Sequence, residues 1–197
     1  MRPGGARLKG RIVPIVAIVL VACGGPSTTD APRASAADPP VVLPASALPR
    51  MTSDVTSVDV DRLANEVVHP DELQALLDEA GFVSGAQRSF GGGTGAFSRV
   101  LSRGLVFETV EGATTFVEWL GDNASEEIVT AERISPALVP DGAVVFRHEP
   151  DGCCHNDVPA FLAAWQHGAS VLFLHVGGPR ANTRAFVELI SSYDREA

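Results

Sequence analysis

The chain has few cysteines, almost no lysine and no long apolar run, and each shortage excludes a class of protein. It contains 3 cysteines in 197 residues, so a dense disulfide framework is excluded. The apolar run at 12–23 is 12 residues long and includes Pro14, whereas a membrane-spanning helix needs about 20 residues. The only lysine is Lys9, so the glycine-rich stretch 91–95 lacks the lysine of a phosphate-binding loop. We interpret 91–95 as a hairpin connection.

Residues 1–22 have the organisation of a secretory signal. Four basic residues come first, an apolar middle follows, and small residues close the segment. The polar, proline-rich sequence after Cys23 marks the end of the signal. We therefore expect the mature protein to begin at Cys23.

The last four residues of this segment indicate a specific kind of signal. Leu20-Val21-Ala22-Cys23 resembles the lipobox of bacterial lipoproteins, in which a small residue precedes an invariant cysteine. The resemblance implies that the Cys23 thiol receives a diacylglyceryl group, that cleavage occurs before Cys23, and that a fatty acid such as palmitate acylates the new amino terminus. The implied partner is the lipid bilayer, at the extracytoplasmic face of the cell membrane. An uncleaved membrane anchor and a plainly secreted protein are the alternatives.

Charge argues against nucleic acid as a partner. The 15 basic residues of the whole chain lose four with the signal, which leaves 11 against 24 acidic residues, or −13 for the mature protein. A protein of that charge repels phosphate backbones. It also disfavours close contact with an anionic lipid surface.

The composition divides the mature chain in two. Residues 23–57 are rich in Pro, Ala, Ser, Thr and Asp and show no apolar periodicity, so we predict a lipidated cysteine followed by a disordered tether. Residues 58–197 form a segment of ordinary domain length. Helices are predicted at 70–80, at 111–123 and from 178 onward, and strands at 82–90, 97–109, 143–148, 159–166 and 170–176.

This element order predicts the fold class. Two hairpins, each followed by a helix, favour a single α+β domain with one antiparallel sheet and about three helices packed on one face. An internal echo suggests two related halves: Gly104-Leu105-Val106-Phe107-Glu108 and Ala169-Ser170-Val171-Leu172-Phe173 each precede a helix with a Phe-Val-Glu sequence. The echo predicts an internal two-fold repeat.

The segment 152–157 contains the only cluster of reactive side chains that the sequence makes evident. Cys153, Cys154 and His155 are consecutive. One interpretation is a metal site, to which His148, His167 and His175 could contribute, although adjacent side chains in extended chain face opposite ways. A second is a vicinal disulfide, strained and easily reduced. The third is two thiols without a chemical role, in a connecting loop.

These observations favour a binding protein over an enzyme. No nucleophile elbow and no His-Glu-x-x-His sequence is present, so we expect no catalytic activity and no cofactor. The whole chain loosely resembles small lipoproteins of G+C-rich bacteria, and the predicted function is binding of a ligand or partner protein at the cell envelope. The alternative is a redox or metal-handling protein that uses Cys153, Cys154 and His155.

Overall fold

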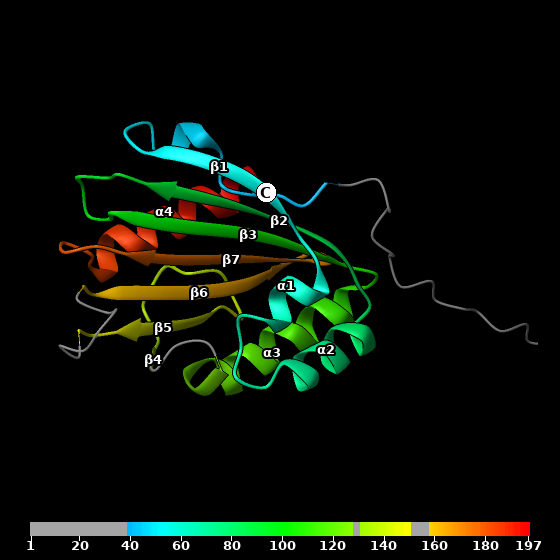
Figure 1. The fold of residues 1–197 in the computed structure, drawn as a ribbon. Helices are drawn as coiled ribbons and strands as arrows, with labels where there is room; N and C mark the ends of the chain where they lie inside the picture. The colour runs from blue at the N-terminus through cyan, green and yellow to red at the C-terminus, as the bar shows by residue number, and fades with distance from the viewer. Residues whose placement is uncertain (1–38, 128–130, 151–157) are drawn as a thin grey trace, which may run out of the picture.

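The structure is a computed structural model that describes residues 39–127, 131–150 and 158–197. These residues form one seven-stranded antiparallel sheet with the order β1-β2-β3-β7-β6-β5-β4 (Figure 1). The predicted α+β class, with one domain built on an antiparallel sheet, is confirmed. The strands are β1 (Thr52–Val58), β2 (Phe82–Gly91), β3 (Arg99–Phe107), β4 (Glu132–Ile134), β5 (Val144–His148), β6 (Ala160–His167) and β7 (Ser170–Gly177), and the helices are η1 (Ala45–Ala47), α1 (Val60–Ala64), α2 (Pro70–Glu79), α3 (Val110–Glu127) and α4 (Thr183–Glu196).

The longer helices begin and end where their capping residues allow. α2 has Pro70 at its first position and two acidic residues in its first turn, and Gly81 follows its end with a φ of 69°. α4 begins later than predicted, at Thr183, because the Asn182 side chain accepts a hydrogen bond from the Ala185 N–H at 3.0 Å. The sequence analysis assigned neither η1, β1 nor α1, and it left the stretch that contains the three-residue β4 open between a short strand and a loop.

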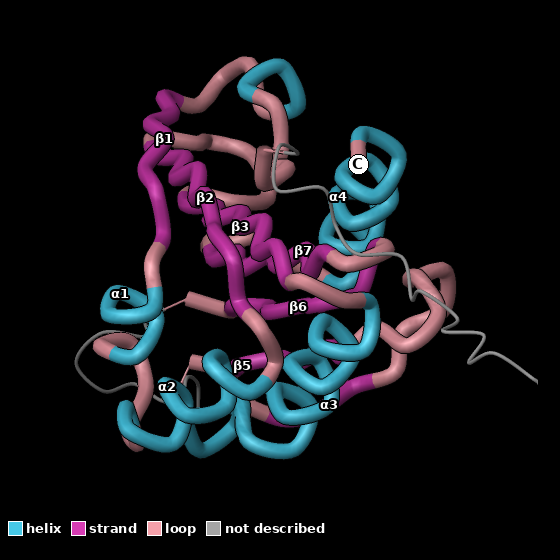
Figure 2. The backbone as a smooth tube through the Cα atoms, turned by 90° about the vertical axis from the view of Figure 1, so that its right-hand side faces the viewer, coloured by secondary structure: helices cyan, strands magenta, loops and turns pink. Residues whose placement is uncertain are grey.

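The sheet is covered by helices on both faces, which corrects the expectation of one helical face. α1, α2 and α3 pack on one face over Leu105, Phe173 and Leu162. α4 packs on the other face over Leu172, Trp165 and neighbouring side chains (Figure 2). Because both faces are buried, β6 and β7 read as nearly continuous apolar runs and not as an alternation.

The segments that suggested a repeat are neighbours in the sheet. β3 and β7 pair antiparallel, with Gly104 opposite Leu172. A two-fold axis perpendicular to the sheet between them would place the helices that follow, α3 and α4, on the same face. These helices pack on opposite faces. The predicted two-fold repeat therefore does not extend from the strands to the helices.

The chain segment before β1 is part of the domain. Leu43 is fully buried in the same core cluster as Tyr193 of α4. The Leu43 N–H donates to Ser102 Oγ of β3 at 2.9 Å. Beside it, a Cβ at Gly104 would lie 2.0 Å from the Val41 carbonyl oxygen. Only glycine at position 104 lets this segment cross the sheet so closely.

A tyrosine fixes the same crossing from the side of the helix. The Tyr193 hydroxyl lies 2.7 Å from the Val41 carbonyl oxygen and 2.9 Å from the Arg103 carbonyl oxygen. The chain then continues through η1 into β1, which pairs with β2 over its whole length. The predicted tether must therefore be corrected: 39–57 belong to the domain, and the rest of the tether and the signal lie outside the described residues.

We predict that the buried N-terminal segment contributes strongly to stability. Leu43→Ala should lower the free energy of unfolding by about 2–5 kcal/mol, because it leaves a cavity in a fully buried site. Val55→Ala on β1, where the side chain is 47% exposed, is the matched control and should change it by less than about 0.5 kcal/mol. Urea unfolding of the two variants measures the difference. Equal stability of the two would contradict the assignment of 39–51 to the domain.

Candidate functional site

The four residues singled out by the sequence lie outside the described residues. Cys23 precedes residue 39, and Cys153, Cys154 and His155 fall in the segment 151–157. Lipidation of Cys23 and each of the three interpretations of the Cys-Cys-His segment therefore stay predictions. Among the described residues, no helix is long and apolar enough to cross a membrane.

The three histidines proposed as helpers of that segment are not gathered in one place. His148 ends β5 and His175 lies in β7 opposite Leu162 of β6, so both face the side covered by α1–α3. His167 lies at the other end of β6, with its Nδ1 3.8 Å from an Asp194 carboxylate oxygen. Within 39–127, 131–150 and 158–197, no cluster of three or more His, Cys, Asp or Glu side chains could hold a metal ion.

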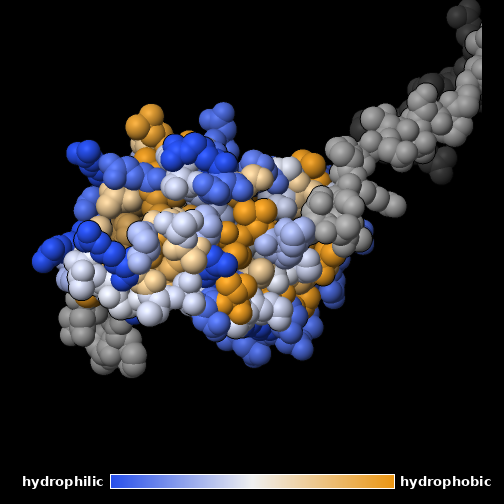
Figure 3. Space-filling view, turned by 90° about the horizontal axis from the view of Figure 1, so that it is seen from above, coloured by the Kyte–Doolittle hydropathy of each residue, from blue (hydrophilic) through white to orange (hydrophobic). Residues whose placement is uncertain are grey.

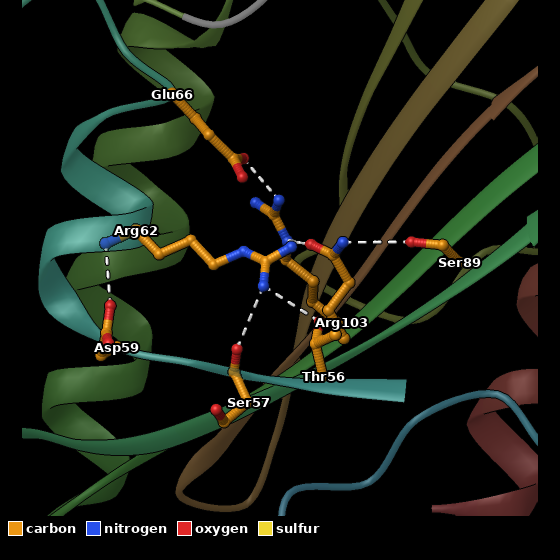
Figure 4. Close-up of polar contacts among 8 residues, drawn as sticks. Thr56, Ser57, Asp59, Arg62, Glu66, Ser89 and Arg103 are labelled. Atoms are coloured by element: carbon orange, nitrogen blue, oxygen red, sulfur yellow. Dashed lines mark hydrogen bonds and ion pairs between the residues drawn. The ribbon is translucent and has the colours of Figure 1, made fainter. Parts of the chain in front are cut away.

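A buried arginine organises the polar side of the face under α1 and α2. Arg103 of β3 is 7% exposed, and its Nε donates to Gln87 Oε1 at 2.6 Å. Its Nη2 donates to the carboxylate of Glu66, in the connection between α1 and α2, and the two side chains point toward one another (Figure 4). Gln87 in turn donates to Ser89 Oγ at 3.1 Å. The Arg103 guanidinium also lies 5.5 Å from the centre of the Phe173 ring.

The geometry of this network favours a structural role. A buried guanidinium is tolerated when its charge is paired and its N–H groups are bonded, and here Glu66 and Gln87 supply both. The adjoining cavity, which Arg103, Glu66 and His175 also line, holds about 70 Å³. That volume is well below the 300–1,000 Å³ typical of a small-molecule site. The network ties the α1–α2 connection to the sheet.

Burial lowers the pKa of His175. Burial first, and then the charges of Arg99 and Arg103 and the neighbouring His148, lower the pKa of His175 from 6.5 to about 4. The imidazole is therefore neutral in the folded protein at neutral pH. It can accept or donate a hydrogen bond there, but it carries no charge that could attract an anion.

We predict a pH dependence of stability from His175. Between pH 6.5 and about 4, the unfolded chain binds a proton at this residue that the folded protein does not, so stability falls as pH falls through that window. The full effect is roughly 3 kcal/mol at about 1.4 kcal/mol for each pKa unit. Unfolding of wild type and His175→Gln at pH 7.5 and pH 4.5 measures it, and all carboxylates are common to both proteins. A variant as acid-sensitive as wild type would disprove the role of His175.

A much larger hollow lies on the other side of the sheet. It is a groove of about 690 Å³ between three segments: 47–51 before β1, 93–97 in the β2–β3 connection, and α4 with Arg180 just before it. Seen from above, the surface of the domain has apolar and weakly polar areas between strongly hydrophilic side chains (Figure 3). The residues that line it are Ala47, Leu48, Pro49, Arg50, Met51, Gly93, Thr94, Gly95, Ala96, Phe97, Arg180, Ala185, Glu188, Leu189 and Ser192.

The walls of this groove are held by backbone contacts. The Ser98 N–H donates to the Gly177 carbonyl at 2.9 Å, which fastens the β2–β3 connection to the end of β7. A Cβ at Gly178 would lie 2.6 Å from the Ala96 carbonyl oxygen, so this approach requires glycine. On the opposite wall, the Met51 N–H donates to the Leu48 carbonyl at 3.0 Å and closes a turn. The groove is therefore preformed by the fold.

The sequence did not predict this groove. Its walls come from segments far apart in the chain, and none of them carries a recognisable motif. The stretch 91–95 was interpreted only as a hairpin connection, which the structure confirms between β2 and β3. The stretch around Arg50 was assigned to a tether. Only the folded chain brings these parts together against α4.

Comparisons with known proteins give distant structural similarity alone. No protein-family model matches the sequence, and no curated protein is significantly similar to it. The chain is similar to the extracellular domain of PknH from Mycobacterium tuberculosis, a crystal structure, with 12% sequence identity and a TM-score of 0.46 over 77% of this chain and 88% of that one. Similarity at this level assigns neither a function nor a site to this chain.

Proposed function

We propose that this protein is a membrane-anchored extracytoplasmic lipoprotein whose domain binds a ligand in the groove beside α4, without catalysing a reaction. The groove is the observation that carries the proposal. Its volume of about 690 Å³ lies within the range of small-molecule sites. Its walls are mostly apolar with a few charged groups at the rim, which is the composition of a binding site that orients its ligand by those charges.

The packing of 39–51 against the domain limits the distance between the domain and the proposed anchor at Cys23. Residue 39 is the first described residue, and Cys23 lies sixteen positions before it. A fully extended chain covers at most about 3.6 Å per residue, so residue 39 can be at most roughly 58 Å from the lipidated cysteine. A tether extending to residue 57 would have doubled that distance. The domain, and its groove with it, would work close to the membrane surface.

We predict that anchoring depends on Cys23 alone. Cys23→Ala should move the protein from the membrane fraction to the soluble fraction, because two or more acyl chains are lost at once and no other membrane contact is proposed. Cys154→Ala is the matched control and should stay with the membrane. Fractionation followed by mass spectrometry of the N-terminal peptide measures both. A Cys23→Ala protein that remains in the membrane fraction would overturn the anchor.

We predict that a ligand accompanies the protein and leaves when the groove is filled. Native mass spectrometry of the full chain, extracted from its own membrane, should show a noncovalent adduct. Ala185→Trp places a large ring in the groove and should abolish the adduct, whereas Glu196→Trp, at the exposed end of the same helix, should retain it.

Equal thermal stability of the two variants is needed to show that Ala185→Trp still folds. The proposal fails if the folded Ala185→Trp protein keeps the adduct, or if wild type carries none.

A further inference from the structure

The floor and walls of the groove suit an unbranched hydrocarbon chain. Leu48 and Met51 contribute one wall, Phe97 the second and Leu189 of α4 the third. Leu189 and Phe97 are also members of the core cluster on this side of the sheet, with 8% and 7% of their surface exposed. A chain that lay along these side chains would remove apolar surface from water on both partners.

The acidic side chain at the rim of the groove has an ion-pair partner, whereas the structure records none for the two arginines there among the described residues. Glu188 lines the groove, but the Arg184 Nε donates to its carboxylate at 3.0 Å. Arg50 and Arg180 also line it, and for neither does the structure record an ion pair among the described residues. Among the described residues, the groove therefore offers two guanidinium groups that have no ion-pair partner.

The overall charge of the protein makes this arrangement unusual. The mature chain carries 11 basic residues against 24 acidic ones. Two arginines in one groove that lack an ion pair with any described residue are therefore an exception to the acidic balance of the protein. Guanidinium groups bind carboxylate through paired N–H···O bonds and do so better than they bind neutral groups. The arginines at the rim thus favour a ligand with a negatively charged head group, and the apolar walls favour a hydrocarbon tail.

We propose that the groove binds a long-chain fatty acid, with the tail along Leu48, Met51, Phe97 and Leu189 and the carboxylate at Arg50 and Arg180. This inference rests on the proposed function, since it names the ligand of the same groove. A single chain fits the volume of about 690 Å³, and a membrane within reach of the anchor supplies such molecules. The apolar tail provides most of the affinity, and the two arginines set the preference for an anion.

Three probes of equal chain length test the proposal on the full chain in lipid nanodiscs. They are photoreactive analogues of palmitate, of hexadecanol and of hexadecyltrimethylammonium. The palmitate analogue should crosslink to peptides from 47–51, 93–97 and α4. It should bind at least about tenfold more tightly than the cationic analogue, because its carboxylate gains two exposed ion pairs whereas the two arginines repel the ammonium group.

Charge variants separate the head group from the tail. Arg50→Gln and Arg180→Gln should each weaken binding of the palmitate analogue about two- to fivefold, the range of an exposed ion pair, and leave the alcohol analogue unchanged. Arg195→Gln, which removes an equal charge from the exposed last turn of α4, should change neither. Raising the salt concentration should reduce the difference in affinity between the charged probes and leave the affinity of the alcohol analogue unchanged.

The outcomes distinguish this inference from the proposed function. If all three probes label the groove equally, the fatty-acid assignment is overturned and the groove remains a binding site. If no probe labels it, the fatty-acid assignment is overturned, and the adduct seen by native mass spectrometry decides the proposed function separately. If the palmitate analogue enters only in the Cys23→Ala protein, the acyl chains of the anchor itself occupy the groove, which also overturns binding of a free fatty acid.

Discussion

The architecture depends on the passage of the N-terminal segment across the sheet. Three contacts define it: the Leu43 N–H on Ser102 Oγ, the Tyr193 hydroxyl between two carbonyl oxygens, and the close approach of Val41 to Gly104. Because Leu43 is buried and the backbone of Val41 is held against the sheet, the chain reaches the edge of the sheet in position to form β1. Residues 47–51, which follow the crossing directly, then become a wall of the groove. The same feature shortens the distance available between the domain and its proposed anchor.

The two faces of the sheet differ in polarity and in the space they leave for a ligand. Under α1–α3, the polar groups of Arg103, Glu66 and Gln87 satisfy one another (Figure 4), and little space is left between them. On the face of α4, the core is apolar, and beside it lies the groove, whose Arg50 and Arg180 have no ion-pair partner among the described residues. A satisfied polar network stabilises a fold, whereas apolar surface beside unpaired charge is suited to a ligand. This contrast is why we place binding beside α4.

The sequence predicted the regular part of this fold well. The helix predicted at 70–80 is α2, and the strands predicted at 159–166 and 170–176 are β6 and β7. These elements are long enough for a repeating pattern to emerge. α1 was not assigned and β4 was left open because five and three residues are too few to show a period. The face on which α4 packs was also missed, because strands buried on both faces lose the alternation that would indicate it.

The candidate site could not be predicted in the same way. The segment around Leu43 is rich in proline and alanine and makes a single irregular crossing, so its composition is that of a linker while its burial comes from tertiary contacts with Ser102 and Tyr193. Arg50 and Arg180 are separated by most of the domain, and no local signal relates them. Conversely, the residues with the most evident chemistry, Cys153 and Cys154, lie outside the described residues. The sequence predicts the sheet, and its anchor stays a prediction, whereas the groove is evident only in the folded chain.

Amide hydrogen exchange of the full chain with and without palmitate tests the central claim most directly. The account predicts that palmitate slows exchange in all three walls of the groove together, and leaves α1, α2 and the Arg103 strand unchanged. Protection confined to the α1–α3 face, or no protection in any of the three walls, would contradict it.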